Sequence, residues 1–157
     1  MSTITPFLWF DTQAEDAANF YVSLFKNSEI TGVSRYGDSG PGPAGSVMTV
    51  SFALDGSPFT AINGGPAHAE FNKAISFQID CADQAEVDHF WEALADGGYE
   101  DACGWVQDRF GLSWQVIPRQ LYACLGGDDA EGAQRAMQAM LGMKKLVVAD
   151  LESAYAG

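Results

Sequence analysis

Basic residues are scarce in this chain. Eight Lys and Arg residues stand against 21 Asp and Glu residues in a total of 157, giving a formal net charge of −13 at pH 7. Nucleic acids and anionic membrane surfaces are bound through basic faces, so this balance excludes both as expected partners. Acidity of this degree is typical of a well-solvated surface.

The sequence also lacks a long apolar run, a signal sequence and paired cysteines. No stretch approaches the roughly 18 apolar residues that a membrane-spanning helix needs. The N-terminus has no basic segment followed by an apolar one, so we expect a cytoplasmic protein. The three cysteines, Cys81, Cys103 and Cys124, include no CxxC pair. They are expected to be free thiols and not ligands of a structural zinc ion.

What the sequence does contain is one internal repeat at a spacing of about 70 residues. The first copy opens with an apolar segment at 7–11 and continues with a predicted helix carrying Phe20 and Tyr21. The second opens at 75–80 and continues with a predicted helix carrying Phe90 and Trp91. A repeat of this length indicates two related modules, and a cavity shared by paired modules is a common place for a small ligand.

Capping signals predict where both helices begin. Thr12 with Glu15, and Asp83 with Glu86, have the spacing of a capping box. Apolar residues follow with a period of 3.6, and Gly97 is suited to ending the second helix.

Strands are predicted between and after the helices. Residues 48–55 alternate between apolar and polar, Asp55-Gly56 forms a hairpin turn, and the chain returns at 59–63. In the second copy, strands are expected at 105–109 and 112–117.

The end of the chain departs from the repeat. A third helix is expected to start at Asp128 or Asp129 and to end before Gly142, with a Met-rich apolar face. We therefore expect a single domain, residues 1–157, with a first module at 1–66, a second at 67–127 and a C-terminal helical extension at 128–157. The Gly- and Pro-rich segment 37–45 is either a long hairpin connection or a loop that covers a pocket.

Seven local motifs resemble one known family and cover nearly the whole chain. They are Pro6–Asp11, Ala17–Tyr21, Asn63–Pro66, Ala74–Phe77, Cys103–Trp105, Asp108–Gln115 and Met137–Leu141. The chain resembles the vicinal oxygen chelate superfamily, which includes glyoxalases, extradiol dioxygenases and bleomycin-resistance proteins. Its closest branch is the PhnB-like group, described as 3-demethylubiquinone-9 3-methyltransferase-like. The resemblance implies an α+β fold of two paired βαβββ modules, with curved sheets around a cavity, and a homodimer.

The metal ligands of the superfamily are not found at the positions that the resemblance implies. His and Glu would be expected near residues 4–6, at Ala74, at Ala61 or Asn63, and at Gln115. Amide and methyl side chains are poor ligands for a buried divalent ion. The two histidines are His89, on the polar side of a helix, and His68, in the linker. We expect no metal.

The methyltransferase description finds no support in a cofactor motif. Binding of S-adenosylmethionine usually requires a strand, a Gly-rich turn and a helix. Asn63-Gly64-Gly65-Pro66 is the only compact candidate, and Pro66 is not followed by a helix pattern. We expect no cofactor.

Aromatic and amide side chains on the strands are the candidate ligand-binding residues. Each Trp is also compatible with core packing, because the pattern does not fix which strand face lines the cavity. The expected substrate-binding residues are Trp9, Asn63, Phe71, Ser76, Gln78, Trp105, Trp114 and Gln115.

Two further residues could carry chemistry. Asp108 could be a general base if a dry cavity raised its pKa, or a turn residue bonded to its own backbone. Cys103 could be a nucleophile if a nearby cation such as Arg109 lowered its pKa, or a packed thiol.

The first functional hypothesis is a metal-independent protein that binds a small apolar or aromatic molecule. The alternatives are a lyase, isomerase or transferase acting on such a molecule, or a metalloenzyme with a rearranged site.

Overall fold

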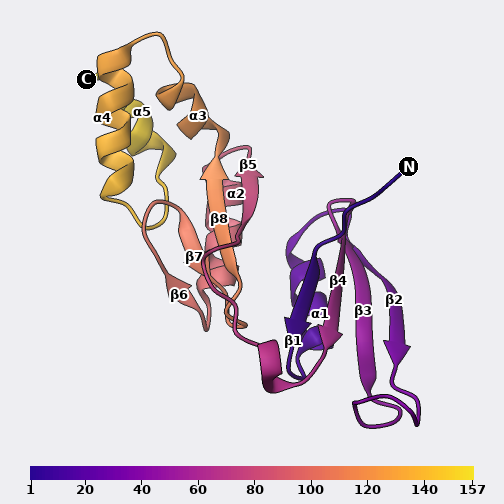
Figure 1. Cartoon of the computed structure of the whole chain (residues 1–157). Coiled ribbons are helices and arrows are strands. Elements are labelled where there is room, and N and C mark those ends of the chain that lie inside the picture. The colour runs from indigo at the N-terminus through magenta and orange to yellow at the C-terminus, as the bar shows by residue number, and fades with distance from the viewer. The chain divides into compact units, whose positions relative to one another are not determined.

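The structure is a computed structural model that describes all 157 residues. It divides into two compact units, a first unit of residues 1–70 and a second unit of residues 71–157 (Figure 1). Each unit contains one four-stranded sheet with a helix packed against it. The predicted α+β class and the two βαβββ modules are confirmed.

The first unit follows the order strand, helix, three strands. Its elements are β1 (Phe7–Phe10), α1 (Ala14–Leu24), β2 (Glu29–Arg35), β3 (Val47–Leu54), β4 (Ser57–Asn63) and the short 3-10 helix η1 (Pro66–His68). The strand order in the sheet is β1-β4-β3-β2, with β1 parallel to β4 and the other pairs antiparallel.

The core of the first unit lies between α1 and one face of the sheet. Val50, Phe52 and Leu54 of β3 are buried, whereas the residues between them are half-buried, as the period of two predicts. Phe52 stacks on Phe59 of β4 with ring centroids 5.5 Å apart. On the helix, alanines and Tyr21 are buried, so α1 approaches the sheet closely.

The hairpin turn at Asp55-Gly56 is confirmed. Both residues have positive φ, 46° and 79°, which is the backbone of the two-residue turns that join antiparallel strands.

The cap predicted for the first helix is wrong. Helix α1 starts at Ala14, its N-cap residue is Gln13, and no side chain from the preceding residues caps it. Instead, the Ala14 amide donates to Oδ1 of Asn63, 49 residues further along the chain. A tertiary contact has replaced the local capping box.

The second unit repeats the topology of the first. Its sheet contains β5 (Phe77–Cys81), β6 (Tyr99–Glu100), β7 (Trp105–Gln107) and β8 (Ser113–Pro118), with α2 (Gln84–Ala95) after β5. The strand order β5-β8-β7-β6, with β5 parallel to β8, matches that of the first sheet. Here the predicted cap by Asp83 is confirmed, because Asp83 Oδ1 accepts from the Glu86 amide. The Glu86 carboxylate reaches back one residue further than a capping box requires and accepts from the Ala82 amide.

The second unit ends in a helical extension made of α3 (Arg119–Leu125), α4 (Ala130–Leu141) and α5 (Val148–Ala156). The first of these helices, α3, follows β8 directly and was not predicted from the sequence. The apolar side chains of the extension share a small core with Ile117 of β8: Leu121, Cys124, Ala136, Leu146 and Leu151. Arg135 of α4 donates to the carbonyls of Ala154 and Tyr155 in α5. All helices of the chain fall short of the length and apolar character that crossing a bilayer requires.

We expect Phe52→Ala to lower the free energy of unfolding of the first unit by about 3–5 kcal/mol, because it removes a fully buried ring from between Tyr21 and Phe59. Val33→Ala on the neighbouring strand β2, where the side chain is 47% exposed, should cost less than about 1 kcal/mol. Urea unfolding followed by circular dichroism measures both. Equal effects would contradict this description of the core.

Candidate functional site

Trp9 lies on the face of β1 that points away from α1, since its neighbours Leu8 and Phe10 are buried against the helix side. Its indole Nε1 donates to the Gly65 carbonyl at 2.8 Å. A Cβ at Gly64 would collide with the indole ring, so the glycine leaves the space that Trp9 fills. The His68 ring meets the indole edge-on at 5.2 Å.

Asn63 joins three elements of the first unit at the end of β4. Its side chain accepts from the Ala14 amide at 2.8 Å and donates to the Val47 carbonyl at 3.2 Å. Its own carbonyl accepts from the hydroxyl of Tyr36 at 2.5 Å. The start of α1, the start of β3 and the end of β2 are therefore tied to one residue.

The Gly- and Pro-rich segment after β2 is wrapped around the Tyr36 ring. Cβ atoms at Gly40 or Gly42 would overlap that ring. The Gly45 amide donates to the Tyr36 carbonyl, and the Ser46 hydroxyl donates to the Pro43 carbonyl. The segment is therefore both the connection between β2 and β3 and the wall of a pocket.

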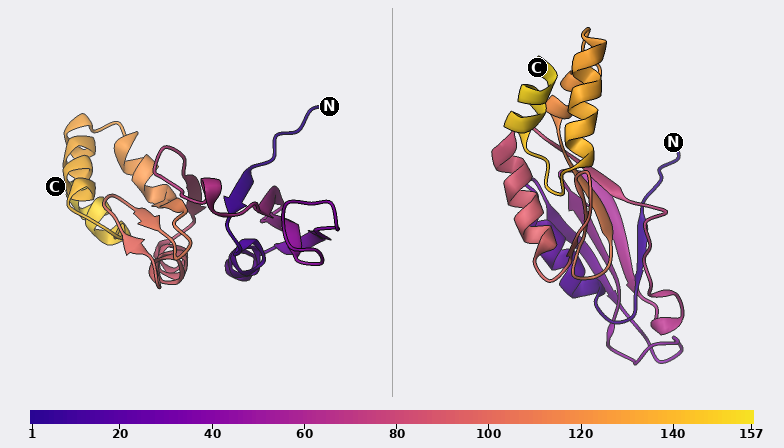
Figure 2. Two further views of the ribbon diagram at one scale, coloured as in Figure 1. Left: turned by 60° about the horizontal axis from the view of Figure 1, so that its bottom comes forward. Right: turned by 90° about the vertical axis from the view of Figure 1, so that its left-hand side faces the viewer.

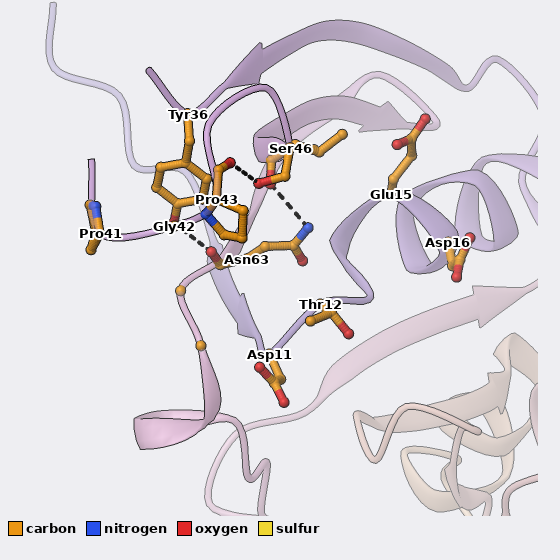
Figure 3. A pocket seen from close by; sticks show the side chains of 13 residues that line it. Asp11, Thr12, Glu15, Asp16, Tyr36, Pro41, Gly42, Pro43, Ser46 and Asn63 are labelled. Atoms are coloured by element: carbon orange, nitrogen blue, oxygen red, sulfur yellow. Dashed lines mark hydrogen bonds between the residues drawn. The ribbon is translucent and has the colours of Figure 1, made fainter. Parts of the chain in front are cut away.

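The pocket has a volume of about 430 Å³. It lies where β1 and β4 end, beside the first turn of α1 and the β2–β3 connection (Figure 3). Its lining residues are Asp11, Thr12, Glu15, Asp16, Tyr36, Pro41, Gly42, Pro43, Ser46, Val47, Asn63, Gly64 and Gly65.

The lining is chemically two-sided. The Tyr36 ring, Pro41 and Pro43 come from the β2–β3 connection. The carboxylate of Asp11 follows β1, and those of Glu15 and Asp16 come from the first turn of α1. No Lys, Arg or His is among the lining residues. The pocket can therefore offer a flat apolar surface together with an acidic side that attracts cations.

In the second unit, four of the predicted binding residues share the sheet face opposite α2. Gln78 is paired in register with Gln115, and Gln115 with Trp105. Gln115 Nε2 donates to the Ser76 hydroxyl at 3.0 Å. Gln78 Nε2 donates to Asp80 and to the hydroxyl of Tyr122 in α3. This polar strip is half-buried to exposed.

Trp114 lies on the other face of that sheet. It is 2% exposed and is paired in register with Phe77, whose ring centroid is 5.7 Å away. The structure thus separates Trp114 from Gln115, as strand alternation requires.

Asp108 is also 2% exposed. Its Oδ1 accepts from the amides of Phe110 and Leu112, and its Oδ2 accepts from Trp114 Nε1 at 2.9 Å. A carboxylate with three donors fixes the turn between β7 and β8 onto the core. This arrangement favours the interpretation of Asp108 as a turn residue over its interpretation as a general base.

Cys103 and Phe71 are the remaining candidates of the second unit. Cys103 is half-buried before β7, with a φ of 58°, and its amide donates to the Met143 carbonyl at 2.8 Å. The guanidinium of Arg109 forms an ion pair with Asp96 at 2.9 Å. Phe71 is the first residue of the second unit and is half-buried.

The His, Cys, Asp and Glu side chains form no group of three or more that could hold a metal ion. The His89 ring contacts Phe90 at 4.9 Å, and His68 contacts Trp9.

Sequence reasoning missed most of the pocket. Tyr36 and the three carboxylates were not predicted as site residues, whereas Asn63 was. An available signal was the position of Tyr36 immediately before a glycine-rich segment, because an aromatic ring beside repeated glycines allows close packing of the backbone on its face.

Two βαβββ modules with the same strand order are the architecture that the resemblance to the vicinal oxygen chelate superfamily implies. The model of the family described as 3-demethylubiquinone-9 3-methyltransferase matches residues 2–117. The chain belongs to this family, in its PhnB-like branch.

Solved structures support the assignment. The PhnB protein of Bacillus cereus is 38% identical, with a TM-score of 0.66, over 74% of this chain and 99% of that one. A Pseudomonas aeruginosa protein is 25% identical, with a TM-score of 0.63, over 75% and 98%. An Arabidopsis thaliana gene product, 22% identical with a TM-score of 0.50 over 74% and 98%, shares the fold. No curated protein matches the chain.

We expect Asp108→Ala to lower the free energy of unfolding by about 2–4 kcal/mol, because three donors, in two buried hydrogen bonds and one part-buried one, lose their acceptor. Asp96→Asn, which removes an exposed ion pair with Arg109, should change it by less than about 1 kcal/mol. Chemical unfolding measures both. An Asp108→Ala variant of wild-type stability would refute the structural role.

The three thiols should differ in reactivity at pH 8. Burial, reinforced by Glu86, raises the pKa of Cys81 to about 12, so only about one molecule in ten thousand carries the reactive thiolate there. Burial and nearby Glu152 also raise the pKa of Cys124. Iodoacetamide labelling with peptide mass mapping should modify the half-buried Cys103 first. Labelling of Cys81 at a comparable rate would contradict its burial.

Proposed function

We propose that this chain binds a small organic molecule in the pocket of its first unit, with an amine or other cationic group of the ligand facing Asp11, Glu15 and Asp16. The observation that carries the proposal is the two-sided lining of a cavity of about 430 Å³. That volume falls within the range of roughly 300–1,000 Å³ typical of small-molecule sites.

The aromatic side of the pocket is held in place before any ligand is present. Tyr36 is 7% exposed and its hydroxyl is bonded to the Asn63 carbonyl. Because Tyr36 is almost fully covered, the exposed Pro41 and Pro43 supply the contact area, on a wall that the ring fixes at a low cost in conformational entropy. This supports the apolar or aromatic ligand body that the sequence predicts.

The carboxylates on the other side of the pocket add a charge preference to that predicted ligand. Three carboxylates without a cation in the lining create a negative potential, which favours positively charged ligands over neutral ones. Each exposed carboxylate should contribute modestly, about 0.2–1 kcal/mol.

The polar strip of the second unit, with Ser76, Gln78, Trp105 and Gln115, remains a proposed second set of binding residues. Its amides and hydroxyls already bond to one another, and they could exchange these bonds for bonds to a ligand.

The methyl transfer named in the family description is not part of this proposal. The glycines of Asn63-Gly64-Gly65-Pro66 serve the contact with Trp9, and the chain continues into the 3-10 helix η1 and not into an α-helix opened by a glycine-rich turn. These residues do not fit a cradle for S-adenosylmethionine. An enzymatic activity using Asp108 or Cys103 stays an alternative prediction, as do the homodimer and the cytoplasmic location that we propose with the family resemblance.

Titration of ¹⁵N-labelled protein with benzylamine, followed by amide chemical shifts, tests the binding site. We expect shifts at residues 11–16, 36–47 and 63–65, and weaker shifts with the matched neutral compound benzyl alcohol, because only the amine carries a charge. Glu15→Gln should weaken benzylamine binding by about 1.5- to 5-fold.

Glu29→Gln is the matched control, since Glu29 is exposed on β2 and does not line the pocket. It removes the same charge from the same unit. Equal affinity for benzylamine and benzyl alcohol, or equal weakening by the two variants, would refute the cationic preference. Absence of any shift in the lining with both compounds would refute the site.

A further inference from the structure

The shared topology of the two units defines a corresponding corner in each. In the first unit this corner is the pocket, bounded by the end of the parallel strand pair, the first turn of α1 and the connection before β3. In the second unit the same three boundaries are the end of the β5–β8 pair, the first turn of α2 and the connection before β7.

One segment of the C-terminal extension contacts all three boundaries of that second corner. It comprises residues 143–148, between α4 and the first turn of α5, and we call it the 143–148 segment. On the connection before β7, the Cys103 amide donates to the Met143 carbonyl and the Gly104 amide donates to the Lys144 carbonyl, both at 2.8 Å.

The start of α2 holds the other end of the segment. Gln84 Nε2 donates to the Leu146 carbonyl at 3.1 Å, and Gln84 Oε1 accepts from the Val148 amide at 2.7 Å. One turn later in the helix, Asp88 pairs with Lys145 at 2.7 Å. The ammonium group of Lys145 lowers the pKa of Asp88, with a further contribution from Gln84.

The side chain of Leu146 packs against the end of the strand pair. It is fully buried and belongs to the core that includes Ile117 of β8. A Cβ at Gly104 would lie 3.1 Å from side-chain atoms of both Ile117 and Leu146, so no space remains between them.

We infer that the 143–148 segment occupies the second unit's counterpart of the ligand pocket, and that it leaves each chain with one open pocket of this kind, in the first unit. The segment supplies both an apolar side chain, Leu146, and a cationic one, Lys145. The stoichiometry part of the inference rests on the proposed function, whereas the closure of the second corner does not.

The segment is an addition to the family's common core. The family model ends at residue 117, within β8, and the Bacillus cereus protein is covered over 99% of its length by 74% of this chain. The second corner is therefore filled by residues that lie beyond the family model.

Native-state hydrogen exchange on the full chain tests the closure. The amides of Cys103, Gly104 and Val148 are bonded across the contact, so Gln84→Ala and Leu146→Ala should each raise the exchange rates of Cys103 and Gly104 together by about tenfold or more. The Gly64 amide, bonded to the Phe10 carbonyl in the first unit, should not change. Gln84→Ala removes only side-chain bonds and serves as the milder variant.

Leu141→Ala is the matched control, because Leu141 is in the same extension but is 62% exposed. It should leave the three amides as they are in the wild type. Exchange of Cys103 and Gly104 that is unchanged in both Gln84→Ala and Leu146→Ala would overturn the closure.

Benzylamine titration of the same variants tests the stoichiometry. In the wild type, shifts should be confined to the first unit, and in Leu146→Ala they should extend to residues 81–88 and 103–104. Where the first-unit lining does shift, equal shifts of these second-unit amides in wild type and variant would overturn the inference. Failure of the proposed function has a different signature, in which the first-unit lining never shifts while the exchange rates still respond to the variants.

Discussion

Each unit depends on its first strand lying parallel to its last. Parallel neighbours cannot be joined by a tight turn, so the helix and the two middle strands must be placed between them in the sequence. The pairing of Phe10 with Asn63, and of Cys81 with Pro118, brings together segments that are far apart along the chain. Three segments of each unit then meet at one corner: the end of the last strand, the start of the helix, and the connection before the third strand in chain order. The corner is therefore a product of the topology.

What fills the corner differs between the two units. In the first, Asn63 uses its amide to bond the helix start and the β3 start, and a cavity remains beside it. In the second, the local side chains of Asp83 and Glu86 accept from amides at the helix start. Gln84 is thereby available to bond the 143–148 segment. Figure 2 shows the strand–helix–strands arrangement of each unit from two further sides. The same backbone arrangement thus supports an open pocket in one copy and a packed contact in the other.

The repeat, the strands and two of the helix caps could be predicted because they depend on residues close in sequence. Asp83, Asp129 and the Asp55-Gly56 turn act within four residues of themselves. Thr12 has the same local signature as Asp83, and the prediction for it is wrong because Asn63, at the end of the neighbouring strand β4 and 49 residues away in the sequence, bonds the helix start. No local pattern carries that information.

The candidate site was harder to predict for the same reason. Alternation along β8 indicates that Trp114 and Gln115 face opposite ways, but only the position of α2 decides which of them is in the core. The pocket depends on a connection folding around Tyr36, which is a tertiary event. Helix α3 was missed because its seven residues are too few for a periodic signal.

The packing of Gly40 and Gly42 on the Tyr36 ring has a thermodynamic consequence. A connection rich in glycine ordinarily samples many conformations and would lose entropy on closing over a ligand. Here the backbone of the connection already packs around the Tyr36 ring in the folded protein. The Tyr36 hydroxyl bonds that ring to the end of β4. The ordering cost belongs to folding and not to association, so more of the contact energy in the pocket is available to hold a ligand.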